Sequence, residues 1–373
     1  MMPPVSTSVI ATGGEWPAGL ALLRGLFAAG VRPVAAVSQR DSLARWSRAA
    51  RTVLIPGPAE PRAHAQALSE LAARHAGAVV LPGSEASLLA LAEHRADFPA
   101  DATLAVPDLR AVERALDKRL LAELAERSGL AVPPTAEHMR RQPSPFGFPI
   151  VVKPFISETR DAQGRLDRVP VRVVRDEDEL ERAVPEGGAL LQAFVPGPLR
   201  TVNGVAWEGR MIATVHQRSE RTWPQGAGVF TYGSTVAADP GLEAGCGRLM
   251  ADLGWSGLFN LQFLEPPEGP PVLIDVNPRA YYSMALAQGA GVNLPGIWLD
   301  LLLGRRPDLG PARVGVRFRA DLDDLRALKT LVAAGRRGDV LRGLLPHRGT
   351  VHVLHAPGDP GPLLQAVAGL MRS

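Results

Sequence analysis

The chain has 373 residues, more than one ordinary domain holds, so we expect two or three domains with separate cores. Hydrophobic residues make up 46% and charged residues 21%, which are values of a globular protein and exclude a disordered one. The formal net charge of +3 is small, and the sequence has no basic tract of the kind that marks nucleic-acid binding.

Cysteine content and the N-terminal segment predict a cytoplasmic protein. Cys246 is the single cysteine, so no intrachain disulfide can form. It falls in Leu242–Leu253, a predicted helix, and we expect a small buried residue there rather than a nucleophile. The first residues lack a signal-peptide pattern, and no apolar run approaches the roughly 20 residues that span a bilayer.

The first hundred residues alternate predicted strands and helices. The strands are Ser8–Thr12, Pro33–Val37, Ala50–Ile55 and Ala78–Pro82. The helices are Pro17–Ala29, Arg62–Ala76 and Ser84–His94. This alternation predicts a parallel sheet flanked by helices.

From Asp108 the pattern changes to helix followed by antiparallel sheet. A helical stripe comes first, with Gly129 as its C-cap: Val112, Leu116, Leu120 and Leu124. Further along, Glu177–Ala183 is a predicted short helix. The predicted strands are Phe148–Lys153, Val169–Val174, Ala189–Val195, Thr201–Trp207, Met211–Gln217, Phe259–Leu264 and Val272–Val276. The tail from Leu309 predicts short strands and helices without an assigned role.

The segment Leu258–Arg279 carries the clearest chemistry, because it predicts two strands joined by a turn rich in proline and glycine. On the first strand the alternation separates the polar pair Asn260 and Gln262 from Phe259, Leu261 and Phe263. On the second it separates Asp275, Asn277 and Arg279 from Ile274 and Val276. Such polar groups are costly to bury without a partner, and Mg²⁺ with bound phosphates would supply one. The alternative is a solvent-exposed strand face.

Two lysines favour the phosphate interpretation. Lys118 opens a predicted helix, and Lys153 ends an otherwise apolar strand, where its ammonium group can meet a phosphate as a point charge. Either lysine taken alone is more often a surface residue whose stem packs on apolar neighbours.

Taken together, the motifs resemble the ATP-grasp superfamily. Asp117-Lys118 followed by GLAVPPT, then FGFPIVVKP, LLQAFVPG and LIDVNPR, occur in the order that this superfamily uses, across roughly Ala11 to Gly304. The chain is most similar to the carboxylate–amine ligase branch related to the carbamoyl-phosphate-synthetase type. The resemblance implies an α/β fold in which a Rossmann-like domain (1–107) precedes a two-lobed ATP-grasp domain (108–304). Its lid subdomain would span 117–190 and its catalytic lobe 191–304, with 305–373 packing on the core.

The resemblance also implies a division of roles. ATP and Mg²⁺, with Mn²⁺ as an alternative ion, would be the cofactors, and a small carboxylate and an amine the substrates. Lys118 and Lys153 would contact phosphates, and Lys153 and Arg279 would be catalytic. The backbone of Gln192, Ala193 and Val195 would face adenine, and Gln262, Asp275 and Asn277 would bind the metal. Dimers are common among similar proteins, so a homodimer is the assembly to test for.

The chain departs from the family pattern at several positions. Gln262 stands where most members carry Glu or Asp, and Gln192-Ala193 stand where an acidic residue is common. The loop after Lys153 has one glycine, Gly164, where many relatives have a glycine-rich loop. Tyr281 and Tyr282 would narrow an acceptor pocket or serve packing, and we favour packing.

The segment His216–Ser234 resembles the substrate-facing strand and loop of this branch. Arg218 and Arg221 could hold an acceptor carboxylate, and Gly226 and Gly228 would let backbone N–H groups approach an oxyanion. A polar hairpin with a glycine turn is an equally good interpretation of these residues.

Two alternatives to an ATP-dependent ligase remain open from the sequence. An ATP-binding module without turnover is favoured by Gln262 and the glycine-poor loop. An NADP-dependent oxidoreductase is suggested by Thr12–Gly19 after the first strand and by Arg40, which could suit a 2′-phosphate. Since this segment lacks the G-x-G-x-x-G spacing, we prefer a Rossmann-like domain without NAD, with Pro82–Glu85 at its ligand-facing edge.

Overall fold

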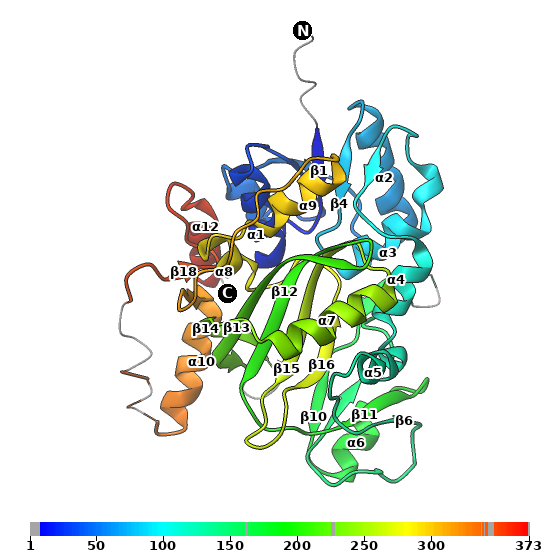
Figure 1. Cartoon of the computed structure of the whole chain (residues 1–373), viewed down its shortest axis with the longest axis vertical. Helices are drawn as coiled ribbons and strands as arrows, with labels where there is room; N and C mark the ends of the chain where they lie inside the picture. Colours follow the sequence, from blue (N-terminus) through cyan, green and yellow to red (C-terminus); the bar gives the residue numbers. More distant parts are fainter. Residues whose placement is uncertain are drawn as a thin grey trace.

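The computed structural model describes residues 8–160, 163, 165–224, 228–336, 338, 340, 341 and 347–371. The first region is a five-stranded sheet in the order β3-β2-β1-β4-β5, with every pair parallel. Its strands are β1 (Val9–Ala11), β2 (Val34–Val37), β3 (Arg51–Leu54), β4 (Val79–Leu81) and β5 (Thr103–Leu104). Its helices are α1 (Pro17–Ala28), α2 (Pro61–Ala73) and α3 (Glu85–Glu93), with 3₁₀ turns η1 (Leu43–Trp46) and η2 (Arg95–Asp97). The predicted parallel sheet is confirmed (Figure 1).

The helical stripe after Asp108 is broken into two helices, α4 (Leu109–Leu116) and α5 (Lys118–Arg127). Asp117 lies between them in an extended conformation and caps α5 by accepting a hydrogen bond from Arg119 N. Because of this break Leu120 is 38% exposed, so its expected place in one buried stripe with Val112 and Leu124 is wrong. Gly129 does follow α5 in the left-handed conformation, as predicted.

A four-stranded antiparallel sheet follows, in the order β10-β7-β11-β6. Its strands are β6 (Thr135–His138), β7 (Ile150–Lys153), β10 (Arg172–Val174) and β11 (Ala189–Ala193). The helix α6 (Glu177–Ala183) closes a small core of its own against this sheet. A separate hairpin of β8 (Glu158–Arg160) and β9 (Leu166–Arg168) reaches the first region, where Leu166 N donates to Ala59 O at 2.8 Å.

The largest sheet has the order β16-β15-β12-β13-β14-β17-β18, and only its last pair is parallel. Its strands are β12 (Leu199–Trp207), β13 (Arg210–Trp223), β14 (Val229–Thr235), β15 (Gly257–Leu264), β16 (Val272–Asn277), β17 (Arg317–Arg319) and β18 (Val351–His352). The helix α7 (Pro240–Leu253) crosses the sheet in Figure 1, and its Cys246 and Leu249 are in the same core cluster as Phe263 of β15. On the other side α8 (Met284–Gly289) and α9 (Leu294–Leu302) pack with α1 of the first region.

The C-terminal segment includes α10 (Asp321–Ala333) and α12 (Gly361–Leu370), and buried ion pairs attach it to the rest. Arg24 of α1 donates to Asp359 at 2.9 Å, and Arg221 of β13 donates to Asp324 of α10 at 2.8 Å. Within the described ranges, no helix has the length and apolar character that a membrane crossing requires.

Candidate active site

The β15–β16 hairpin brings the predicted metal ligands together. The register places Gln262 directly opposite Asp275 and Asn260 directly opposite Asn277. Residues that are directly opposite in an antiparallel pair point to the same face, so all four side chains share one face of the sheet. The sequence predicted this alternation, and the structure adds which residue lies beside which.

A register shift in β16 changes one prediction. The pairing skips Ile274, so Phe263 lies opposite Leu273. Leu273 therefore joins Val276 in the main core, whereas Ile274 packs against a different cluster, and its expected place beside Val276 is wrong. The Ile274 carbonyl accepts a hydrogen bond from Lys153 Nζ at 2.6 Å, which connects the end of β7 to β16.

Two buried ammonium groups surround Asp275. Lys118 Nζ donates to Asp275 Oδ1 at 2.5 Å, and the side chains are 10% and 23% exposed. Burial by itself would raise the pKa of Asp275, but the charges of Lys118 and Lys153 outweigh it and hold that pKa below its usual value. Burial lowers the pKa of Lys153 to about 8, against the opposing effect of Asp275. The site is therefore a compact cluster of charges with little water around it.

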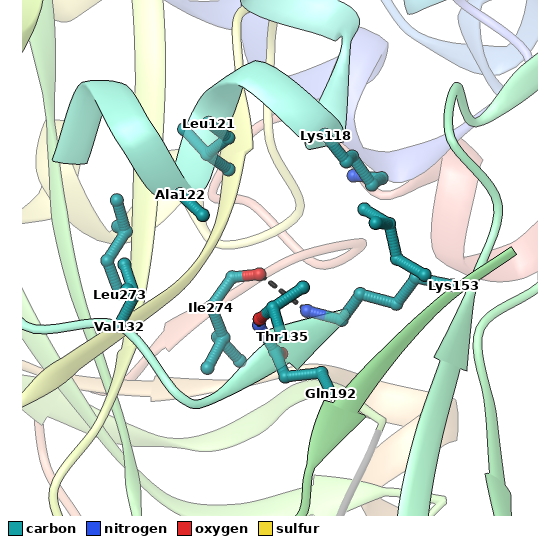
Figure 2. A pocket seen from close by; sticks show the side chains of 10 residues that line it. Lys118, Leu121, Ala122, Val132, Thr135, Lys153, Gln192, Leu273 and Ile274 are labelled. Carbon is teal, nitrogen blue, oxygen red and sulfur yellow. Dashed lines mark hydrogen bonds between the residues drawn. The ribbon is translucent and has the colours of Figure 1, made fainter. Parts of the chain in front are cut away.

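A pocket opens beside these lysines, between α5 and the four-stranded sheet (Figure 2). Apolar side chains form most of its walls: Leu121, Ala122, Val132, Leu190, Leu273 and Ile274. Its polar lining comes from Lys118, Lys153, Thr135 and Gln192, and Gln192 Nε2 donates to Thr135 Oγ1 at 3.1 Å. Of the predicted hinge residues, Gln192 and Ala193 end β11, and Val195 follows just after the strand. Apolar walls with a few polar groups are the usual composition of a small-molecule site.

Arg279 lies just after β16, and its guanidinium is held by three contacts. Its Nε donates to Glu85 Oε1 at 3.0 Å, its Nη1 to Ala280 O at 2.9 Å and its Nη2 to Asn277 Oδ1 at 3.0 Å. Glu85 comes from the first region, where it begins α3 and is 4% exposed. The sequence indicated the Pro82–Glu85 loop as a ligand-facing edge but not this pairing. Since a guanidinium has five N–H groups, donors remain for an anion.

The donor set fits a hard cation. No group of three His, Cys, Asp or Glu side chains suited to a metal occurs in the described part of the chain, so any site here must use amide oxygens as well. Gln262, Asp275 and Asn277 offer two amide oxygens and a carboxylate on one sheet face. Such oxygen ligands suit Mg²⁺, which usually keeps several ligands from water and phosphate.

The structure does not bring Arg218 to this site. Arg218 lies opposite Arg200, which lies opposite Phe263, so all three point to the α7 face of the sheet rather than to the Gln262 face. There Arg218 Nε donates to Glu265 Oε2 at 2.5 Å. Arg218 thus lies on the opposite face of the sheet from the predicted metal ligands, because one residue of offset reverses the face on a strand, and its contact with an acceptor carboxylate stays a prediction.

Arg221 and Gly228 are also engaged within the chain. Arg221 makes a bidentate pair with Asp324 at 2.8 Å for both bonds, and its guanidinium stacks 4.0 Å from the Tyr232 ring. A Cβ on Gly228 would lie 2.0 Å from the backbone of Trp223, so glycine is needed there for close chain packing. Gly226 and Gly164 lie outside the described residues. The interpretation of His216–Ser234 as a structural hairpin accounts for the Arg221–Asp324 pair and for the close approach of Gly228 to Trp223.

The first region favours the interpretation without NAD. A Cβ on Gly83 would lie 2.1 Å from Thr12 O, and one on Gly13 would lie 3.1 Å from the Gly83 backbone. The two loops that flank the β1–β4 switch point thus pack on each other, where a dinucleotide would need its pyrophosphate. At the end of β2, Ser38 Oγ donates to Glu15 Oε1 at 2.9 Å, and Arg40 is exposed.

Cys246 and the two tyrosines serve packing. Cys246 is fully buried in α7, and burial raises the pKa of its thiol to about 12, so it is inert as a nucleophile. Tyr281 is 2% exposed within the core that α8 and α9 form with α1. Tyr282 donates its hydroxyl to Asp323 of α10.

Comparisons with known proteins agree with this fold. Residues 187–321 match the family described as "ATP-grasp in the biosynthetic pathway with Ter operon". A D-alanine--D-alanine ligase of Anaeromyxobacter sp. (strain Fw109-5) is 28% identical over 183 residues, which cover 45% of this chain and 56% of that protein. The chain thus matches only about half the length of this relative.

Solved structures share most of the fold. The L-amino acid ligase from Bacillus licheniformis superposes with a TM-score of 0.57 and 16% identity, over 80% of this chain and 74% of that one. The biotin carboxylase domain of Hydrogenobacter thermophilus 2-oxoglutarate carboxylase was solved with MgADP and bicarbonate. It superposes with a TM-score of 0.62 and 15% identity, over 83% of this chain and 73% of that one. The fold is of α/β architecture, with a parallel sheet followed by mostly antiparallel ones. The chain is thus similar to ATP-grasp proteins in sequence over residues 187–321 and in fold over most of its length.

Proposed function

We propose that this protein is a Mg²⁺-dependent ligase that uses ATP to activate a carboxylate as an acyl phosphate, which an amine then attacks. The observation that carries the proposal is that Lys118 and Lys153 line one largely apolar pocket and that Lys118 pairs with Asp275 beside it. A bound divalent ion would supply charge neutralisation for the phosphates, held by Gln262, Asp275 and Asn277.

The chain's own residues would act by holding and orienting charge. The pocket would take adenine, with the backbone of Gln192, Ala193 and Val195 beside it. The ammonium groups of Lys118 and Lys153 would meet the triphosphate where it leaves that pocket, and Lys153, whose pKa is lowered to about 8, is mostly charged at neutral pH. No protein nucleophile is needed, because positioning and electrostatics suffice for phosphoryl transfer.

Arg279 would meet the oxygens of the phosphoryl group as it moves to the carboxylate. Its plane is fixed from three sides by Glu85, Asn277 and Ala280, so its remaining N–H donors keep one direction. A preorganised donor that does not reorient during the reaction lowers the barrier most. The likeness to ligases that act on amino acids supports amino acids and small carboxylates as the substrates to screen.

The test is an ADP-release screen over amino acids and small carboxylates with the full chain. Release that requires a carboxylate and an amine together supports the ligase. If calorimetry shows that ADP binds but no substrate pair leads to ADP production from ATP, the result would instead support an ATP-binding module. The neutral side chain of Gln262 favours that alternative. Gel filtration with light scattering tests the homodimer that similar proteins suggest.

A further inference from the structure

A chain of side-chain amides crosses the sheet from β13 to the proposed metal ligands. Asn203 of β12 donates from Nδ2 to Val215 O at 3.2 Å and to Thr201 Oγ1 at 2.8 Å. Asn260 of β15 donates from Nδ2 to Asn203 Oδ1. Asn260 Oδ1 in turn accepts from Gln262 Nε2 at 3.2 Å and from Asn277 Nδ2 at 3.0 Å.

The direction of this chain is set at its far end. A backbone carbonyl can only accept, so Val215 O requires that Asn203 present its nitrogen, not its oxygen. The Asn203 oxygen then faces Asn260, which must present its own nitrogen in return. The Asn260 oxygen is left to face Gln262 and Asn277, and both of those must turn their nitrogens toward it. Each step permits one amide orientation only.

The consequence appears at the two amide ligands. With their nitrogens committed to Asn260, Gln262 and Asn277 direct their oxygens away from it, and the Asn277 oxygen already accepts from Arg279. An amide turned the other way would offer an N–H to a cation, which repels it. A carboxylate has no such ambiguity, so Gln at the first ligand position adds a second amide, beside that of Asn277, that must be oriented.

We propose that Asn203 is a positioning residue that, through Asn260, orients the amide oxygens of Gln262 and Asn277 toward the divalent ion. Asn203 is 0% exposed and Asn260 is 3% exposed, so water does not compete for these hydrogen bonds. The inference rests on the proposed function, because it concerns the same metal site. It goes beyond that function by assigning a role to a residue that contacts neither metal nor nucleotide.

The experiment measures Mn²⁺ affinity by electron paramagnetic resonance, with saturating ADP and without turnover. Asn203→Ala removes the anchor and lets Asn260 turn over, so we expect a Kd for Mn²⁺ about 10- to 100-fold higher, as for other residues that orient metal ligands. The matched control is Asn293→Ala, which removes an amide that is also hydrogen-bonded at both ends but lies at the start of α9. Circular dichroism checks that both variants fold.

A second background separates orientation from general damage. In Gln262→Glu the side chain at position 262 is a carboxylate with no amide to orient, so Asn203→Ala should cost less Mn²⁺ affinity there than in the wild-type background, the remaining loss coming from Asn277. An equal loss of Mn²⁺ affinity in both backgrounds, or no loss in the wild-type background, overturns the orienting role of Asn203. If the wild-type protein binds no Mn²⁺ with ADP, the proposed function fails, and the proposed role of Asn203 fails with it. If the wild type binds Mn²⁺ and Asn203→Ala has no effect on the affinity, only the role of Asn203 is rejected.

Discussion

The parallel sheet of the first region and the large antiparallel sheet differ in where they keep polar groups. Strands β1, β2 and β4 consist of Val, Ile, Leu and Ala, and these residues are almost all buried. Strands β12, β15 and β16 instead bury Thr201, Asn203, Asn260 and Asn277 on one face. Because both faces of a parallel sheet are covered, its chemistry must come from loops, whereas an antiparallel sheet can hold a site on the strands themselves.

This contrast explains what each region contributes to the site. The antiparallel face supplies the proposed metal ligands and the amide chain that orients them. The described part of the first region supplies Glu85, the first residue of α3 after the carboxyl end of β4, as the partner of Arg279. We therefore expect substitutions on the antiparallel face to act on chemistry, and substitutions among the first region's loops to act mainly on stability.

The largest effect should come from Asp275→Ala. Removing this carboxylate leaves Lys118 without its partner and the metal site without its charged ligand, so turnover should fall by about 1,000-fold or more while the fold persists. An ADP-release assay measures turnover, and circular dichroism measures whether the fold persists. Asp252→Ala removes a carboxylate of α7 that pairs with Arg127 of α5, away from the site, and should leave turnover unchanged. Retained activity in Asp275→Ala would show that the metal is held elsewhere.

Asp324→Asn tests whether Arg221 is structural. Asp324 is 0% exposed and carries a bidentate bond from Arg221, so its loss should lower the free energy of unfolding by about 3–5 kcal/mol. Glu123→Gln, at an exposed pair on α5, should change it by less than about 0.5 kcal/mol. Urea denaturation measures both. If Asp324→Asn is as mild as the control, the C-terminal segment does not depend on this pair.

Gly83→Ala probes the loop packing of the first region. The added Cβ would lie 2.1 Å from Thr12 O, so the loops must separate, and we expect a loss of about 1–3 kcal/mol in unfolding free energy. Gly147→Ala has open space around its Cβ and should change stability by no more than about 1 kcal/mol. Thermal unfolding of the two variants side by side decides the matter; equal melting temperatures would mean that the β1–β4 crevice is open.

Lys153 predicts a modest pH dependence of nucleotide binding. Its pKa is lowered to about 8, so the ammonium is present below that pH and lost above it. ADP affinity of the free protein should therefore fall by about tenfold as the pH rises from about 7 to about 9, the loss of one charge-assisted hydrogen bond. Lys153→Arg keeps its charge across this range and should show a flatter profile by calorimetry. A wild-type profile as flat as that of the variant would contradict the assignment.

The sequence by itself determined the parallel sheet, most strand positions and the alternation of polar and apolar side chains along β15. These follow from local periodicity, which repeats every two residues on a strand and about every 3.6 on a helix. It also identified Lys118, Lys153 and Asp275, since each sits at a recognisable place beside a strand or helix end.

Only the tertiary structure decided the rest, because it depends on register and on contacts between distant residues. The skipped Ile274 directs a carbonyl to Lys153, and the face on which Arg218 lies follows from its pairing with Arg200. Glu85 meets Arg279 from 194 residues away, and the amide chain exists only where three strands align their asparagines. No local pattern encodes such contacts, since each requires two separate segments to be placed together in space.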